Sequence, residues 1–129
     1  MQLGVIGLGR MGQIVVNRVL DAGHDVVAFD LSEEAVATAA EAGAEPASSV
    51  DDFASRLDDE KRIWLMVPAG EAVDATLDEL DPHLDADDVV VDGGNSHFEA
   101  SVRRAEATDA AYLDCGTSGG PAGAELGFS

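Results

Sequence analysis

Positive charge is scarce in this sequence of 129 residues. Seven Lys and Arg residues stand against 26 Asp and Glu, which gives a formal net charge of −19 at pH 7. Nucleic acids and anionic membranes are bound by basic surfaces, so both are excluded as partners. The sequence also has a single lysine, Lys61, against 16 aspartates.

This excess of aspartate over lysine is typical of proteins that work in concentrated salt. At about 1 M salt the Debye length falls to about 3 Å, so the repulsion between surface carboxylates is screened. In dilute buffer the same repulsion opposes folding. We therefore expect a halophilic protein, with an ordinary acidic protein as the alternative.

Cysteine and long hydrophobic runs are also nearly missing. Cys115 is the only cysteine, so no disulfide can form within the chain and a reducing compartment is expected. The apolar stretch at the start is short, rich in glycine and followed by Arg10, unlike a signal peptide or a membrane span. His83 has no partner at the spacing of metal ligands, and no metal site is expected. These features predict a cytoplasmic protein.

Short apolar runs alternate along the chain with longer alanine-rich stretches. With 46% hydrophobic residues the chain is too apolar for a disordered acidic tail, and its length suits one domain. The short runs predict strands and the longer stretches predict helices. The expected strands span 2–7, 25–30, 44–47, 62–67, 88–92 and 111–114, and the expected helices span 11–22, 33–42, 49–57, 71–80 and 97–108.

Several expected strands are nearly continuous apolar runs, such as the one over 62–67. Such runs are typical of a parallel sheet covered on both faces. The alternation therefore predicts an α/β fold: a Rossmann-like, doubly wound, mainly parallel sheet with helices on both faces, formed by one domain over residues 1–129. The aspartates in predicted turns or helix ends are expected only to be solvated, namely Asp51, Asp52, Asp58, Asp59, Asp85, Asp87 and Asp88.

A glycine-rich turn joins the first expected strand to the first expected helix. Residues 7–12, Gly-Leu-Gly-Arg-Met-Gly, have the GxGxxG spacing of dinucleotide-binding folds. In that motif Gly7 permits a tight turn, Gly9 lets the backbone approach a pyrophosphate, and Gly12 allows close packing of helix and strand. The N–H groups at the start of the helix can then bind phosphate. A tight turn that binds nothing is the alternative.

Asp30 ends the second expected strand, at the distance from the glycine turn where such folds place an acidic residue. Its carboxylate can accept a hydrogen bond from the ribose 2′-hydroxyl of NAD and would repel the 2′-phosphate of NADP. The sequence therefore predicts NAD as the cofactor, with NADP less favoured. Arg10 complicates this prediction, because its guanidinium could bind the phosphates of either cofactor.

Three further segments at expected strand ends complete a recognisable pattern. They are residues 65–70, 92–96 and 115–120, with the sequences LMVPAG, DGGNS and CGTSGG. Together with the glycine turn they resemble the N-terminal coenzyme-binding domain of the decarboxylating 6-phosphogluconate dehydrogenases, over essentially the whole chain. Asp30 is similar to the NAD-linked branch of that family, whereas the NADP-linked branch has Asn-Arg-Thr at this place.

The resemblance implies a site at the carboxyl ends of the strands. Coenzyme contacts are expected from the residues that match the family's glycine turn, second strand end and covering loop: Gly7, Leu8, Gly9, Arg10, Met11, Gly12, Asp30, Leu31, Ser32, Val67, Pro68, Ala69 and Asn95. Substrate contacts are expected from Asn95, Ser118, Gly119 and Gly120. The Asn95 amide can donate and accept, and the two glycines let backbone N–H groups approach an anion.

The resemblance also implies the reaction, which is oxidative decarboxylation of 6-phosphogluconate to ribulose 5-phosphate with reduction of NAD, in the pentose phosphate pathway. The family's proton-transferring lysine and glutamate match no position up to Ser129, and Lys61 does not correspond to that lysine. The family's all-helical C-terminal domain, through which the enzymes form homo-oligomers, is also missing. We therefore expect a truncated chain that binds NAD but is inactive alone.

Two other functions are compatible with the sequence. The 3-hydroxyacid dehydrogenases, such as 3-hydroxyisobutyrate dehydrogenase, share the glycine turn and a Ser-Gly-Gly. Their fifth strand ends in Asp-x-Ser-Thr, whereas residues 92–96 here read Asp-Gly-Gly-Asn-Ser. The second alternative is a stand-alone NAD-binding module without catalysis.

Overall fold

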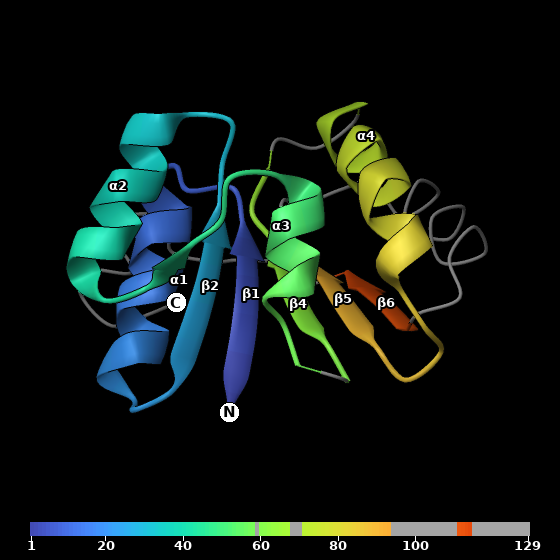
Figure 1. Cartoon of the computed structure of the whole chain (residues 1–129), viewed down its shortest axis with the longest axis horizontal. Helices are drawn as coiled ribbons and strands as arrows, with labels where there is room; N and C mark the ends of the chain where they lie inside the picture. The colour runs from blue at the N-terminus through green and yellow to red at the C-terminus, as the bar shows by residue number, and fades with distance from the viewer. Residues whose placement is uncertain (59, 68–70, 94–110, 115–129) are drawn as a thin grey trace.

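Six parallel strands form one sheet at the centre of the molecule (Figure 1). The computed structural model describes residues 1–58, 60–67, 71–93 and 111–114. The strand order is β3-β2-β1-β4-β5-β6, and all five pairings between neighbours are parallel. The chain builds outward from β1 to β3 on one side, then crosses to β4 and builds outward on the other. This topology confirms the doubly wound α/β fold.

The strands are short and end close to the expected positions. They are β1 (Gln2–Ile6), β2 (Asp25–Phe29), β3 (Glu45–Pro46), β4 (Arg62–Leu65), β5 (Val89–Asp92) and β6 (Ala111–Asp114). β1 stops before Gly7, where φ becomes positive, one residue earlier than expected. β3 has only two residues, because Pro46 has no N–H to extend the hydrogen-bond ladder. Its place at the edge of the sheet is where proline is tolerated.

Four α-helices and one 3-10 helix connect the strands in the described part of the chain. They are α1 (Arg10–Asp21), α2 (Glu33–Ala42), α3 (Val50–Ser55), α4 (Glu71–Leu80) and η1 (Asp81–His83). α2 and α4 match the expected bounds, whereas α3 is shorter than 49–57 because Ser49 is its N-cap and Arg56 its C-cap. The helix expected over 97–108 lies outside the described residues. None of the described helices is both long and apolar enough to cross a membrane.

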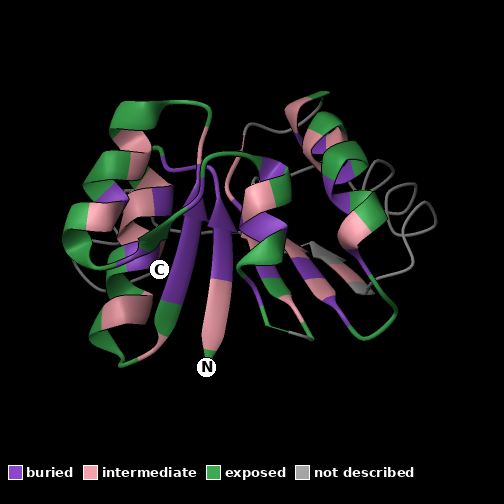
Figure 2. Ribbon diagram, viewed as in Figure 1, coloured by how far each residue is buried: buried purple, intermediate pink, exposed green. Residues whose placement is uncertain are grey.

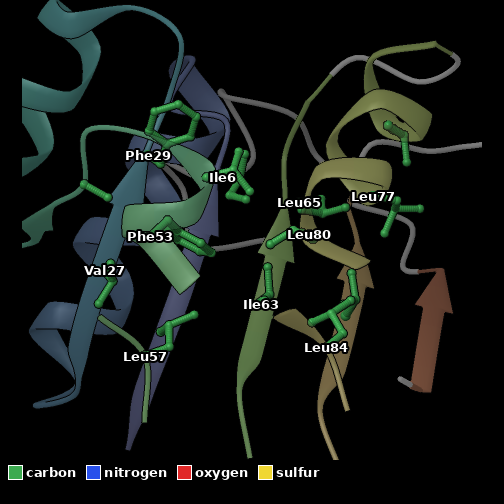
Figure 3. Packing of buried hydrophobic residues seen from close by; sticks show 14 residues of the cluster. Ile6, Val27, Phe29, Phe53, Leu57, Ile63, Leu65, Leu77, Leu80 and Leu84 are labelled. Carbon is green, nitrogen blue, oxygen red and sulfur yellow. The ribbon is translucent and has the colours of Figure 1, made fainter. Parts of the chain in front are cut away.

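Alternate residues of the strands enter two hydrophobic clusters, one on each face of the sheet. Val5 and Val26 pack with residues of α1 and α2, whereas Ile6 and Val27 pack with residues of α3 and α4. Figure 2 shows the buried strands between the two pairs of helices, and Figure 3 shows the second cluster around Phe53. The two-residue period of a strand produces this division. It confirms the expectation of helices on both faces.

Asp88 contradicts the expectation that the aspartates of the connections are only solvated. Its side chain is 2% exposed, and its carboxylate accepts hydrogen bonds from the N–H groups of Lys61 at 2.7 Å and Asp85 at 2.8 Å. The Lys61 ammonium lies 3.8 Å from the same carboxylate. Asp88 directly precedes β5, so its hydrogen bonds join the loops that lead into the amino ends of β4 and β5.

Two aspartates of α3 also have partners that the sequence did not predict. Asp52 accepts from the Ser48 N–H at 2.9 Å and from the Arg56 guanidinium at 3.0 Å. These two partners, the Ser48 N–H first, lower the pKa of Asp52 below its ordinary value. Asp51 lies 2.7 Å from the His83 ring, so the expectation of solvation alone was wrong for both residues.

Candidate functional site

The carboxyl ends of the strands around β1 form the candidate site. β1 lies between β2 and β4, and the chain reaches these two neighbours by connections that lead away in opposite directions (Figure 1). Doubly wound sheets bind ligands at such a switch point, because the diverging loops leave a crevice there. The turn from β1 to α1, residues 7–9, lies at this switch point, and Gly7 lines a cavity there.

The first and third glycines of the turn are required by close backbone contacts. Gly7 has a φ of +99°, and a Cβ there would lie 2.6 Å from the carbonyl carbon of Met66. A Cβ at Gly12 would lie 1.9 Å from the carbonyl oxygen of Gly7. Neither position has room for a side chain. The turn is therefore tight, and α1 packs directly against the end of β1.

Gly9, the second glycine, faces open space instead. Among the described residues, a Cβ there would have no neighbour within 4 Å. Gly9 is the N-cap of α1 and offers no side chain to the N–H groups of the first turn. That turn carries no acidic residue, whereas the first turns of α2, α3 and α4 each carry two. The start of α1 thus combines open space, backbone N–H groups and the positive end of the helix dipole, which together suit an anion.

Asp30 connects the end of β2 to the glycine turn. One of its carboxylate oxygens accepts from the Leu8 N–H at 2.7 Å, and the other accepts from the Ser32 N–H at 2.8 Å. Each carboxylate oxygen has two lone pairs, so each can accept another hydrogen bond. The half-buried Asp30 therefore holds the turn and remains able to bind a hydroxyl group.

A cavity of about 250 Å³ lies beside Asp30. Asp30 and Leu31 border it on the β2 side, and Thr76 and Glu79 border it on the α4 side. Its other walls are mostly apolar and come from the strand ends, the start of α3 and α4: Ile6, Phe29, Val50, Val67, Ala72 and Ala75. The Leu31 side chain is 94% exposed at the rim. The cavity suits an apolar ring with polar groups at its edge.

A second, larger hollow of about 510 Å³ shares Asp30 with the first cavity. Glu33, Asp52 and Arg56 also line it. Arg56 donates to Asp52 at 3.0 Å and to Glu45 at 2.9 Å, so its guanidinium is already engaged by carboxylates. The surface of this hollow around Asp30 is therefore predominantly acidic.

The sequence matches one protein family along nearly its whole length. The match covers residues 2–129, and the family is described as the NAD binding domain of 6-phosphogluconate dehydrogenase. The chain belongs to this family. The assignment confirms the resemblance seen in the glycine turn and the strand-end motifs, and it agrees with the parallel sheet and the crevice at β1.

Two relatives from this family are named as NAD(+)-dependent, decarboxylating 6-phosphogluconate dehydrogenases. That of Haloferax volcanii is 85% identical over 129 residues, which cover 100% of this chain and 43% of the relative. That of Bacillus subtilis is 36% identical over 134 residues, which cover 98% of this chain and 29% of the relative. The chain therefore spans less than half the length of these relatives.

Solved structures of two kinds of dehydrogenase are similar to the domain. A 6-phosphogluconate dehydrogenase of Plasmodium falciparum has a TM-score of 0.83 and 29% identity, and the match covers 96% of this chain and 28% of that one. A 3-hydroxyisobutyrate dehydrogenase of Mycobacterium tuberculosis has a TM-score of 0.85 and 25% identity, with 95% and 42% covered. The backbone alone does not separate the two kinds, whereas the sequence match is to the 6-phosphogluconate dehydrogenase family.

The residues expected to contact the coenzyme differ in what they present to the site. The Leu8 side chain is buried in the cluster beneath α1 and α2, so only its backbone borders the turn. The Ser32 hydroxyl accepts from the Ala35 N–H and caps α2. In the first turn of α1, Arg10 is exposed and Met11 is half-buried. Several expected residues lie outside the described part: Pro68, Ala69, Asn95, Ser118, Gly119 and Gly120.

Two residues near the site were not among the expected coenzyme or substrate contacts, although Asp92 is the first residue of the DGGNS motif. The Gln13 amide donates to the Ala35 carbonyl at 2.8 Å and to the Leu8 carbonyl at 3.3 Å, and so joins the glycine turn to α2. Asp92, at the end of β5, is fully buried and accepts from the Tyr112 hydroxyl at 2.8 Å. Both act through contacts between segments distant in the sequence, which a local motif does not reveal.

Proposed function

We propose that the chain binds NAD at the carboxyl ends of β1 and β2, and that residues 1–129 form the dinucleotide-binding domain of a longer 6-phosphogluconate dehydrogenase. The observation that carries the proposal is the glycine turn, where Gly7 and Gly12 are enclosed by backbone while Gly9 faces open space. These are the roles that a dinucleotide-binding turn requires. The 85% identity to an NAD(+)-dependent relative supports both the cofactor and the reaction.

The described residues around the turn fit the parts of NAD. N–H groups at the start of α1 would bind the pyrophosphate, where the helix dipole favours negative charge. Asp30 would accept from a ribose hydroxyl with the lone pairs not used by Leu8 and Ser32. Adenine would occupy the apolar cavity beside Leu31. Bound NAD supplies a hydride acceptor, and the domain supplies its binding and orientation.

The acidic surroundings of Asp30 support NAD rather than NADP. A 2′-phosphate would be placed against the Asp30 carboxylate, and the adjoining hollow adds Glu33 and Asp52. Arg56, the cation of that hollow, is already held by two carboxylates. Like charges in close contact raise the free energy of the complex, so the phosphate would bind more weakly than a hydroxyl.

The proposed reaction requires groups beyond those described. The C3 hydroxyl of 6-phosphogluconate would lose its proton to a base as hydride passes to NAD, giving a 3-keto acid. This acid loses CO2 because the new carbonyl accepts the electron pair as an enolate, and protonation of the resulting enediol gives ribulose 5-phosphate. We assign substrate binding to Asn95, Ser118, Gly119 and Gly120. We assign proton transfer and homo-oligomer formation to the remainder of the longer protein.

An activity assay tests this proposal against its alternatives. We expect a protein of the relatives' full length to form NADH from 6-phosphogluconate, with kcat/KM for NAD at least about tenfold above that for NADP, or about 1.4 kcal/mol. The 129-residue chain should bind NAD without forming NADH. The DGGNS sequence at 92–96 argues against the 3-hydroxyacid alternative. Turnover of 3-hydroxyisobutyrate in place of 6-phosphogluconate would support that alternative. NADH formation by the 129-residue chain would refute the assignment of proton transfer to the remainder.

The net charge of −19 supports a further proposal, that the protein works in the cytoplasm of a cell with high internal salt. We expect its free energy of unfolding to rise between dilute buffer and about 2 M KCl, because screening weakens the repulsion between carboxylates. Urea unfolding followed by circular dichroism at several KCl concentrations measures this change. A free energy that stays flat or falls with KCl would contradict the proposal.

A further inference from the structure

One stripe of α4 borders the cavity beside Asp30 and carries two polar residues. Ala72, Ala75, Thr76 and Glu79 line the cavity at positions i, i+3, i+4 and i+7, so they lie along one face of the helix. Leu77, on another face, packs into the core. Neither Thr76 nor Glu79 has a part in the binding of phosphate or ribose proposed above.

Thr76 and Glu79 can accept hydrogen bonds from a ligand in the cavity but cannot donate them. The Thr76 hydroxyl already donates its single hydrogen to the carbonyl oxygen of Ala72 at 2.8 Å, so only its lone pairs remain. An ionised carboxylate such as that of Glu79 is also an acceptor only. Residues three apart on a helix are neighbours on its surface. The α4 side of the cavity is therefore an acceptor surface that complements a group with two N–H donors.

The cavity is suited to one ring system of the cofactor. Its volume of about 250 Å³ is below the range of about 300–1,000 Å³ typical of pockets that enclose a whole ligand. Phe29 and Val50 contribute to its apolar walls, which suit the faces of a purine. Asp30 lines the same cavity from the end of β2, so a base that enters the cavity from a ribose at Asp30 would meet Thr76 and Glu79 on α4.

We propose that Thr76 and Glu79 make this cavity selective for adenine over a 6-oxo purine. The exocyclic amine of adenine has two N–H donors, which match the two acceptors on α4. Hypoxanthine has a carbonyl oxygen at the same position, so acceptor would face acceptor. The inference rests on the proposed binding of NAD at the glycine turn. It assigns selectivity for the base to α4, whereas Asp30 recognises the ribose.

Titration calorimetry with NAD and with nicotinamide hypoxanthine dinucleotide tests this assignment. We expect the 129-residue chain to bind NAD about tenfold more tightly than the hypoxanthine analogue. Glu79→Gln should reduce this ratio to about twofold, because the amide can turn its NH2 group towards the carbonyl oxygen. Thr76→Val removes the second acceptor and should lower the ratio by about threefold.

Asp78→Asn is the matched control, because Asp78 is exposed on α4, lies next to Glu79 in the sequence and does not line the cavity. It removes the same charge and should leave the ratio unchanged. Equal affinities of the unaltered chain for the two dinucleotides would overturn the inference while leaving the proposed function intact. A ratio that falls equally in Asp78→Asn and Glu79→Gln would also overturn it, because net charge would then be the cause. Failure to bind either dinucleotide would instead refute the proposed function.

Discussion

Replacing Gly12 with alanine is expected to abolish NAD binding and to lower the free energy of unfolding by about 2–3 kcal/mol. The new methyl group would lie 1.9 Å from the carbonyl oxygen of Gly7 and 2.9 Å from its carbonyl carbon. Both are backbone atoms, so the overlap is relieved only if α1 moves away from the end of β1. That movement displaces the N–H groups proposed to bind the pyrophosphate. Urea unfolding and calorimetric titration with NAD measure the two losses.

Gly9→Ala is the control that separates binding from folding. A methyl group at Gly9 meets no atom within 4 Å in the described part of the chain, and the residue's φ of −67° is open to alanine. We expect the free energy of unfolding to fall by less than about 1 kcal/mol, a loss in the range for an unfavourable N-cap. NAD affinity should still fall at least about tenfold, because the methyl group occupies space proposed for the phosphates. Equal losses of unfolding free energy in Gly12→Ala and Gly9→Ala would contradict the assignment of packing to Gly12 and of phosphate binding to Gly9.

The contrast between these glycines was predictable from the sequence, whereas the contacts of Asp30 were not. The GxGxxG spacing after an apolar strand assigns a separate role to each glycine, and the structure bears out the packing of Gly7 and Gly12. The motif also predicts an acidic residue at the end of β2. It does not predict that Asp30 accepts from the Leu8 N–H, because that contact depends on how two loops lie after the sheet has formed. The same limit applies to Gln13.

Strand and helix positions followed from patterns that are local. α2 was predictable to the residue, because Ser32 caps its start and Gly43 takes the left-handed conformation at its end. β3 was predictable only weakly, because Pro46 and its edge position leave two residues in the ladder. The residues proposed to bind substrate have only their sequence motifs as support, since Asn95 and Ser118 lie outside the described residues.

The aspartates of the loop before β5 show most clearly where local patterns fail. Asp85, Asp87 and Asp88 lie within four positions in an acidic turn, and the local sequence predicts that all three are solvated. In the structure Asp85 and Asp87 are exposed, whereas Asp88 is buried. The difference arises from Lys61, which is 27 residues away in the sequence and whose backbone N–H bonds to Asp88. Burial of a charged group therefore depends on a partner that no local pattern supplies.

Asp88→Ala is expected to lower the free energy of unfolding by about 2–4 kcal/mol. The change leaves the N–H groups of Lys61 and Asp85 without the buried carboxylate that accepts from them, and the Lys61 ammonium without its counter-ion. NAD affinity of the folded variant should not change, since Asp88 lies at the amino end of β5 and the site lies at the carboxyl ends. The exposed neighbour variant, Asp87→Ala, should change the free energy by less than about 0.5 kcal/mol. Urea unfolding at one fixed KCl concentration compares them, because both variants remove one negative charge. If the two lost the same stability, general charge repulsion and not the buried contacts of Asp88 would govern this end of the sheet.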